Sequence, residues 1–229
     1  MEAIILAGGF GTRLQSVVSD LPKPMAPIAG RPFLEILLAS LAQQGFTRII
    51  LSLGYLAHTI IDHFGDTFAG MDLEYEIEQT PLGTGGAIRQ AMQKCNSDHV
   101  FIFNGDTFLE FNAQIVEQQW LTAQKPIIVA CQLSNTERYG RLEHIDNRVT
   151  GFSEKGQTGI GLINAGCYVF PLNLLDDFKV AQAFSLENDF LTQAVKQQHF
   201  ELFISYGHFI DIGIPEDYLR AQTELLILI

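Results

Sequence analysis

The chain has 229 residues, 47% of them hydrophobic, and its 14 basic and 26 acidic residues give a formal charge of −12 at pH 7. This composition fits one globular domain with a large core. The negative charge argues against partners with an anionic backbone or surface, so we expect no binding to nucleic acid or to a membrane. The apolar runs are far shorter than the roughly 20 residues that a membrane-spanning helix needs.

The N-terminus and the cysteines indicate a cytoplasmic protein. Glu2 stands where a signal peptide would carry basic residues, and the first apolar run stops at Gly8. The cysteines are odd in number and widely spaced, at Cys95, Cys131 and Cys167, which argues against a disulfide framework or a zinc site. We expect them to be reduced core residues.

In the first half of the chain, short β-branched apolar runs alternate with segments that carry apolar residues at helical spacing. Strands are predicted at 3–7, 48–53, 73–77, 100–103 and 127–131. Helices are predicted at 32–44, 58–64, 86–94 and 114–123. This alternation predicts an α/β fold with a mostly parallel sheet covered on both faces. Ligands of such sheets lie beyond the carboxyl ends of the strands.

The pattern changes after Tyr139 to shorter strand-like pieces. Strands are predicted at 141–145, 148–154, 163–170 and 202–205, with a helix at 186–197. A last helix is predicted from Pro215 to about residue 228, since proline and the acidic Glu216 and Asp217 favour a first helical turn. No linker or internal repeat separates the halves, so a single domain is expected.

The first strand leads into a glycine-rich loop, Gly8-Gly9-Phe10-Gly11-Thr12-Arg13, and Lys23 follows among several prolines. Glycines allow positive φ and bring backbone N–H groups against a ligand, and Arg13 and Lys23 add two cations, so we expect a polyphosphate site. A dinucleotide fingerprint would need a third glycine at Leu14, and a Walker loop would need Gly-Lys-Ser/Thr, which does not occur. A plain turn between strand and helix is the alternative.

The segments Leu6-Ala7-Gly8-Gly9, Gly11-Thr12-Arg13-Leu14 and Lys23-Pro24 together resemble the signature of the sugar-1-phosphate nucleotidyltransferases. These enzymes join a sugar 1-phosphate to a nucleoside triphosphate and release pyrophosphate. The resemblance spans nearly the whole chain and implies a Rossmann-like, mostly parallel mixed sheet flanked by helices, elaborated by extra strands in the C-terminal half. It places nucleotide binding at about 1–135 and sugar-phosphate binding at about 136–229 within one domain, 1–229.

Within this family, the chain is most similar to the members that transfer a guanylyl group from GTP to D-glycero-α-D-manno-heptose 1-phosphate for surface polysaccharides. The resemblance implies catalytic roles for Arg13, Lys23 and Asp106, with Arg13 stabilising transition-state charge and Lys23 holding phosphate. The nucleotide-binding residues that it implies are Leu6, Ala7, Gly8, Gly9, Gly11, Thr12, Arg13, Glu78, Pro81, Gly83, Thr84 and Asp106.

Two aspartates are candidates for a magnesium site. Asp106 ends the segment Asn104-Gly105-Asp106 at a predicted strand end, and Asp211 stands inside an apolar run, where an unpaired charge would cost several kcal/mol. Mg²⁺ prefers hard oxygen ligands and keeps several waters, so two carboxylates and substrate phosphate oxygens suffice. The resemblance places both residues at the family's metal-binding positions. Ordinary turn chemistry is the alternative for Asp106 alone.

The stretch 78–87 resembles the family's base-recognition segment, with Gly83 against the nucleobase and Glu78 facing the base edge. A carboxylate offers only acceptors, which matches the N1–H and the exocyclic amine of guanine, whereas uracil and thymine present a carbonyl beside their N–H. We therefore favour GTP. A solvated acid at the end of a strand is the alternative for Glu78.

On the acceptor side, the segments 151–155 and 163–166 resemble the family's sugar-phosphate-binding segments. Glu154 and Asn164 are expected to bind sugar hydroxyls and Lys155 to bind the phosphate. The sugar-phosphate-binding residues implied are Gly105, Glu154, Lys155, Asn164, Gly166 and Glu187. Arg141 is a weaker candidate.

Other readings stay open at this stage. The same reaction with mannose 1-phosphate and GTP, or with a hexose 1-phosphate and UTP, fits the motifs. A nucleotide-sugar-binding regulatory subunit without catalysis is the non-enzyme alternative. The sugar is not readable from a motif, because epimers differ in single hydroxyl groups. Family analogy favours a homodimer, and the apolar end at 225–229 is available to pack on its own domain or on a second subunit.

Overall fold

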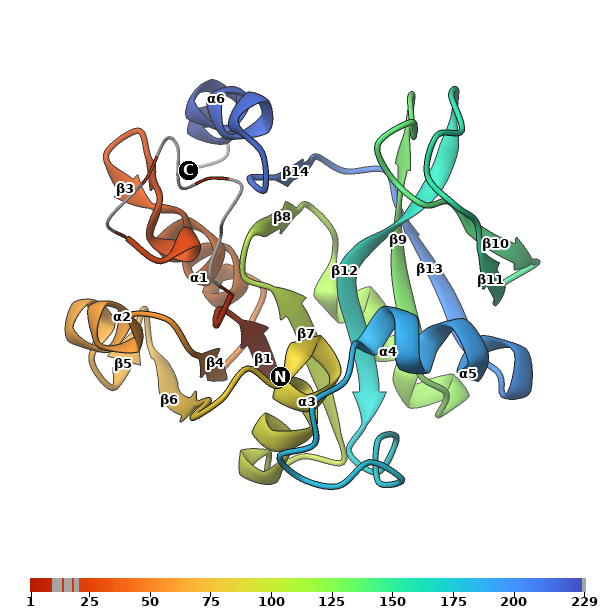
Figure 1. Ribbon diagram of the computed structural model, residues 1–229, viewed down its shortest axis with the longest axis horizontal. Coiled ribbons are helices and arrows are strands. Elements are labelled where there is room, and N and C mark those ends of the chain that lie inside the picture. The colour runs from red at the N-terminus through yellow and green to blue at the C-terminus, as the bar shows by residue number, and fades with distance from the viewer. Residues whose placement is uncertain (10–13, 15–17, 19–20, 228–229) are drawn as a thin grey trace.

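The computed structural model describes residues 1–9, 14, 18 and 21–227 of the chain. Its centre is a ten-stranded mixed sheet with the strand order β10-β11-β13-β9-β12-β7-β1-β4-β6-β5. The sheet includes strands from both halves of the chain, and helices lie on both of its faces (Figure 1). None of the helices in the described residues is long and apolar enough to span a membrane.

Four central strands are parallel, and they end at the same edge of the sheet. They are β1 (Glu2–Leu6), β4 (Arg48–Leu53), β6 (Met71–Ile77) and β7 (His99–Asn104). Leu6 pairs with Ser52 on one side and with Asn104 on the other, so the residues that follow these three strands meet at one edge. The short β5 (Thr67–Phe68) pairs with β6 at the outer edge.

The other half of the sheet is built around β12 (Gly161–Pro171), which lies antiparallel between β7 and β9. The remaining strands of this half are β9 (Ile127–Leu133), β10 (Leu142–Ile145), β11 (Arg148–Phe152) and β13 (Glu201–Ser205). Because β13 pairs parallel to β9, both parallel and antiparallel neighbours occur in this half. The strand positions predicted from the sequence are confirmed to within a few residues.

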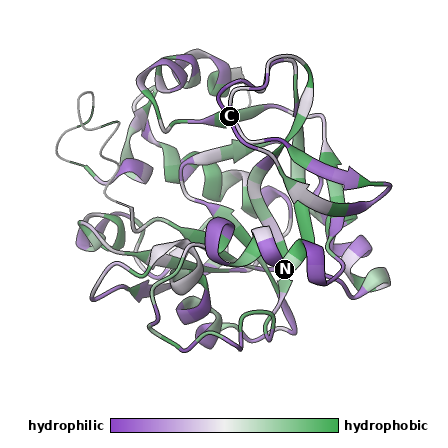
Figure 2. Ribbon diagram, turned by 45° about the vertical axis from the view of Figure 1, so that its right-hand side comes forward, coloured by the Kyte–Doolittle hydropathy of each residue, from purple (hydrophilic) through white to green (hydrophobic). Residues whose placement is uncertain are grey.

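Alternating side chains of the strands feed two separate cores, one on each face of the sheet. Ile5 packs with Leu38 and Val116 on one face, whereas Ile4 packs with Ile88 on the other. The helices are α1 (Phe33–Gln43), α2 (Ala57–Phe64), α3 (Gly83–Ala91), α4 (Ala113–Ala123), α5 (Thr192–Gln197) and α6 (Pro215–Glu224). Figure 1 shows α3 and α5 in front of the sheet and α4 behind it, and Figure 2 shows its strands coloured largely hydrophobic.

Two helices differ from their predicted ranges. The helix predicted from residue 86 begins at Gly83, and the one predicted at 186–197 consists of a π-helix (Leu186–Leu191) followed by α5. The last helix begins at Pro215 as predicted, then tightens into a 3₁₀ turn at Leu225–Ile227. Leu225 is fully buried against α6 and its neighbours, so this part of the apolar end packs on its own chain.

Two small two-stranded antiparallel sheets lie beside the main sheet. One pairs β8 (Thr107–Leu109) with β14 (Phe209–Asp211), which are far apart in the chain, and the other is a hairpin of β2 (Pro27–Ile28) and β3 (Arg31–Pro32). The cysteines are free, with Cys131 and Cys167 buried and Cys95 half-buried, in line with the prediction of reduced thiols.

Candidate active site

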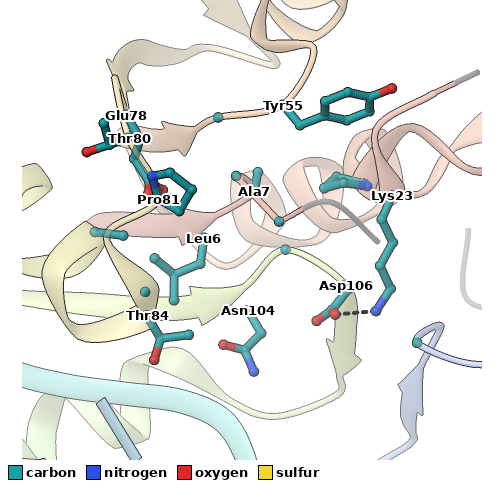
Figure 3. Close-up of a pocket in the computed structure, with 18 of the residues that line it drawn as sticks. Leu6, Ala7, Lys23, Tyr55, Glu78, Thr80, Pro81, Thr84, Asn104 and Asp106 are labelled. Carbon is teal, nitrogen blue, oxygen red and sulfur yellow. Dashed lines mark hydrogen bonds and ion pairs between the residues drawn. The ribbon is translucent and has the colours of Figure 1, made fainter. Parts of the chain in front are cut away.

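A cavity of about 530 Å³ opens at the carboxyl ends of the parallel strands. Its walls come from the segments after β1, β4, β6 and β7, with Lys23 and Gly213 completing the rim (Figure 3). The lining residues are Leu6, Ala7, Gly8, Gly9, Lys23, Pro24, Gly54, Tyr55, Glu78, Gln79, Thr80, Pro81, Gly83, Thr84, Ala87, Asn104, Gly105, Asp106 and Gly213. Most residues predicted from the sequence to bind nucleotide are among them.

The start of the glycine-rich loop is fixed by its neighbours. The N–H of Ala7 donates to Ser52 O at 2.8 Å, which continues the pairing with β4 by one residue. A Cβ atom on Gly8 would stand 2.7 Å from Glu78 Oε1 and 3.1 Å from the nitrogen of Gly54. Glycine is therefore required at this position by close packing of three segments. Of the predicted loop residues, Gly11, Thr12 and Arg13 lie outside the described residues.

Lys23 and the two predicted metal-binding aspartates meet at one side of the cavity. The Lys23 ammonium forms an ion pair with Asp106 and lies 3.8 Å from Asp211 Oδ1. Antiparallel pairing of β8 with β14 brings the carboxylates together, because Asp211 pairs with Thr107 and the N–H of Ile212 donates to Asp106 O at 3.0 Å. The side chain of Lys23 is only 10% exposed, whereas those of Asp106 and Asp211 are 34% and 32% exposed.

This donor set suits a divalent cation that brings other ligands with it. Asp106, directly before β8, and Asp211, at the end of β14, supply hard carboxylate oxygens, and both are partly exposed. In the described part of the chain, no group of three or more His, Cys, Asp or Glu side chains is arranged to hold a metal. A cation bound here would therefore complete its coordination shell with waters and phosphate oxygens, as Mg²⁺ does at phosphoryl-transfer sites.

Glu78 follows β6 and lies at the other side of the cavity. Its Oε2 accepts a hydrogen bond from the N–H of Leu82 at 2.9 Å, which leaves Oε1 beside Gly8. Burial raises the pKa of Glu78 above its ordinary value, and the hydrogen bond from Leu82 acts in the opposite direction. A partly desolvated carboxylate that keeps acceptor capacity is suited to a ligand with N–H donors.

Packing within the chain also constrains the glycines that follow Glu78, while the predicted contact of Gly83 with the nucleobase stays a prediction. Gly83 has φ +67°, and a Cβ atom there would stand 2.6 Å from the carbonyl oxygen of Phe184. A side chain on Gly85 would collide with the ring of Phe184, and one on Gly86 with the carbonyl oxygen of Gln182. Packing of the segment at 182–184 against the start of α3 thus accounts for these glycines, while Gly83 also lines the cavity.

Thr84 joins the predicted nucleotide side to the predicted acceptor side. Its Oγ1 donates to Glu187 at 2.9 Å and accepts from the N–H of Leu186 at 2.8 Å. Through Thr84, the structure therefore brings Glu187 to the wall of the cavity.

Asn164, another predicted acceptor residue, is hydrogen-bonded within its own strand. It donates to the Tyr168 hydroxyl at 2.7 Å and accepts from the N–H of Gly166 at 3.1 Å.

The other predicted acceptor residues divide into two groups. Gly105 lines the cavity, and a Cβ atom there would stand 2.5 Å from the carbonyl oxygen of Leu6. Glu154 and Lys155 are exposed on the loop that follows β11 and are not among the lining residues. Arg141 binds back to its own loop through Thr136 Oγ1 and Thr158 O, so its guanidinium serves the local structure.

Sequence reasoning missed several lining residues. Tyr55 and Gly54 directly follow the strand predicted at 48–53, so their position at a strand end was the available signal. Asn104 ends β7 and was considered only as part of a turn before Asp106. Gly213 also lines the cavity. A Cβ atom there would stand 2.7 Å from Asp211 Oδ1 and 3.0 Å from Lys23 Nζ, and no local sequence pattern reveals this close approach.

Comparisons with known proteins agree with this geometry. The sequence matches the family described as Nucleotidyl transferase over residues 2–226. D-glycero-alpha-D-manno-heptose 1-phosphate guanylyltransferase of Aneurinibacillus thermoaerophilus is 44% identical over 226 residues, which cover 98% of each chain. The protein of that name from Campylobacter jejuni is 40% identical over 220 residues, covering 95% of this chain and 97% of its own.

A solved structure shows the same fold at similar identity. The crystal structure of HddC from Yersinia pseudotuberculosis complexed with GMP-PN is 39% identical and has a TM-score of 0.88, covering 98% of this chain and 99% of that chain. The match confirms the fold class that the sequence predicted.

Proposed function

This chain belongs to the nucleotidyl transferase family, and we propose that it transfers a guanylyl group from GTP to a sugar 1-phosphate, with D-glycero-α-D-manno-heptose 1-phosphate the favoured acceptor. The observation that carries the proposal is a cavity lined by Glu78 at one side and by Lys23 and Asp106 at the other, with Asp211 next to Lys23. Full-length likeness to proteins named for this reaction supports the choice of nucleotide and sugar. A nucleotide-sugar precursor of this kind serves the synthesis of surface polysaccharides.

The reaction is an in-line displacement at phosphorus. An oxygen of the sugar 1-phosphate forms a bond to the α-phosphorus of GTP, the bond to the bridging oxygen breaks, and pyrophosphate leaves with that electron pair. No general base is needed, because a phosphate monoester with a second pKa of about 6 is mostly dianionic at neutral pH. The barrier lies in charge repulsion and alignment, which cations and positioning relieve.

We assign phosphate binding to Lys23 and stabilisation of the transition-state charge to Arg13. Asp106 and Asp211 would hold Mg²⁺, which supplies charge neutralisation between the two anionic substrates. Since the Lys23 ammonium pairs with Asp106 and lies near Asp211, it keeps these carboxylates compensated in the free protein. With Mg²⁺ bound to the two carboxylates, Lys23 would be available to bind substrate phosphate.

The base and the acceptor sugar are assigned to opposite sides of Thr84. Glu78 would accept hydrogen bonds from the N1–H and the exocyclic amine of guanine. Pro81 and the backbone of Gly8, which line the cavity, would contact the nucleobase. The acceptor is assigned to Gly105, Glu154, Lys155, Asn164, Gly166 and Glu187, as the family resemblance implies. Family analogy favours a homodimer, and use of GTP places the reaction in the cytoplasm.

A pyrophosphate-release assay with a matrix of substrates tests the proposal. GTP, UTP and dTTP are each combined with heptose 1-phosphate, mannose 1-phosphate and glucose 1-phosphate in the presence of Mg²⁺. We expect the highest kcat/KM for GTP with heptose 1-phosphate. Turnover with UTP and none with GTP would overturn the role of Glu78, and a preference for mannose 1-phosphate would change the acceptor alone. Stabilisation by GTP without any turnover would support the regulatory alternative.

A further inference from the structure

Asn104 and Asn164 are two half-buried asparagines on neighbouring strands near the cavity, and their hydrogen bonding differs. The carboxamide of Asn164 on β12 donates to Tyr168 at 2.7 Å and accepts from the N–H of Gly166 at 3.1 Å. Both ends of this amide are therefore engaged within the chain. Its hydrogen bonds hold the backbone at Gly166, which faces β7.

Asn104, the last residue of β7, is not engaged in this way. It lines the cavity, and its carboxamide makes no hydrogen bond to any of the described residues. Gly166, at φ +68°, leaves room for this amide, because a Cβ atom there would collide with it. A half-buried carboxamide has two N–H donors and a carbonyl acceptor to satisfy, so a ligand in the cavity can supply its hydrogen-bond partners.

The position of Asn104 lies between the two substrates. Figure 3 shows its carboxamide between Thr84 and Asp106. Asp106 belongs to the charged side of the cavity through Lys23, whereas Thr84 is tied to Glu187 by a 2.9 Å hydrogen bond. A group bound by Asn104 thus lies close both to the reacting phosphates and to the side assigned to the acceptor.

We propose that the Asn104 carboxamide binds two adjacent hydroxyl groups of the acceptor sugar, accepting from one and donating to the other, and is a specificity-determining residue. This inference rests on the proposed function and deepens it. The carboxamide presents one acceptor and one donor side by side, which suits neighbouring hydroxyls on a pyranose ring. A site with such a group rejects a sugar that lacks the partner hydroxyl, because the amide is then left unpaired.

Asn104→Leu tests this role, since leucine is similar in size and cannot form hydrogen bonds. We expect the KM for the sugar 1-phosphate to rise about 10- to 100-fold, while the KM for GTP changes less than about twofold. Asn104→Ala, which adds no bulk beside Gly166, should show the same split. On an acceptor that lacks the hydroxyl bound by Asn104, found by screening monodeoxy sugar 1-phosphates, wild type and variants should have equal kcat/KM.

Asn112→Leu is the matched control, because Asn112 caps α4 through a 3.1 Å hydrogen bond from the N–H of Ile115 and does not line the cavity. It should lower Tm and leave both KM values unchanged. Equal increases in both KM values for the Asn104 variants, or a fall in Tm with no change in the sugar KM, would overturn the inference. Wild-type protein without turnover on any sugar 1-phosphate would overturn the proposed function, and the inference with it.

Discussion

Two ionic clusters lie at opposite ends of the same parallel strands, and they differ in whether one of their carboxylates is closed off from solvent. The cavity cluster consists of Lys23, Asp106 and Asp211 at the carboxyl ends. The base cluster lies at the amino ends, where Arg48 forms ion pairs with Glu2 and Glu74. In each cluster a cation lies between two carboxylates, and in the base cluster Lys94 also pairs with Glu74.

In the base cluster, the backbone closes off one carboxylate, Glu2, while the side chain of Glu74 is 38% exposed. Glu2 is 5% exposed at its side chain and accepts hydrogen bonds from the N–H groups of Asn96 and Ser97 at 3.0 and 3.2 Å. In the cavity cluster, the side chains of Asp106 and Asp211 are 34% and 32% exposed, and Asp106 lines the cavity of about 530 Å³. Asp211 Oδ1 also accepts a hydrogen bond from the N–H of Gly213 at 2.7 Å, whereas Asp106 accepts none from the backbone of the described residues. A carboxylate whose lone pairs are taken up by backbone donors stabilises the fold, whereas one that keeps accessible lone pairs can bind an external cation.

The largest effect is expected at the cavity cluster. Asp106→Asn removes a carboxylate with little change in volume, so the fold should persist while turnover falls by about 100- to 1,000-fold, as is typical when one group that stabilises the transition state is removed. Pyrophosphate release and Tm, measured on the same preparation, separate these effects. Full activity of this variant would exclude Asp106 from the reaction.

The opposite result is expected at the base cluster. Glu2→Gln leaves Arg48 with one buried partner fewer and weakens the capping of Asn96 and Ser97. We expect a loss of about 2 to 3 kcal/mol in the free energy of unfolding, because a buried charge loses its compensation. Urea denaturation measures the loss, and kcat of the folded fraction should match that of the wild type. A selective loss of kcat would break the distinction between the clusters.

The meeting of Glu78, Asp106 and the Gly8 loop was predictable from sequence, because parallel strands end at one edge of a sheet and strands are recognisable from their apolar runs. The position of β12 between β7 and β9 was not, since strand order depends on contacts between residues far apart in the chain. The packing that constrains Gly83, Gly85 and Gly86 was not predictable either, because their neighbours lie in the segment at 182–184, about a hundred residues away in the chain. The same holds for Asn104, whose environment depends on Gly166.

Lys23→Met tests the cavity cluster by its affinity for a divalent cation, independently of activity. The Lys23 ammonium occupies the space beside both carboxylates of the cavity cluster, so its removal should raise the affinity for Mn²⁺ without nucleotide by about tenfold. Titration followed by electron paramagnetic resonance counts the free Mn²⁺ directly. The wild type should bind the ion more tightly once a nonhydrolysable GTP analogue is present, since phosphate then pairs with Lys23.

Lys94→Met is the matched control at the base cluster, where Lys94 lies 3.1 Å from Glu74. Because Glu74 remains paired with Arg48, the Mn²⁺ affinity should change less than about twofold. Equal gains in the two variants would show that any lost lysine raises the affinity through net charge alone. That result would remove the argument for a cation site at Asp106 and Asp211.

The smallest effect concerns the acid at the far side of the cavity. Burial raises the pKa of Glu78 above its ordinary value of 4.5, so the carboxylate begins to take up a proton as the pH falls from neutral toward this raised value. Protonated Glu78 loses acceptors for guanine, so the KM for GTP should rise about threefold between roughly pH 7 and pH 5. The phosphates titrate in the same range, near pH 6. In Glu78→Gln the substrate phosphates still titrate but the carboxylate is absent, so the KM for GTP should depend less on pH than in the wild type. Parallel pH profiles of the KM in the two proteins would assign the whole pH dependence to the substrate.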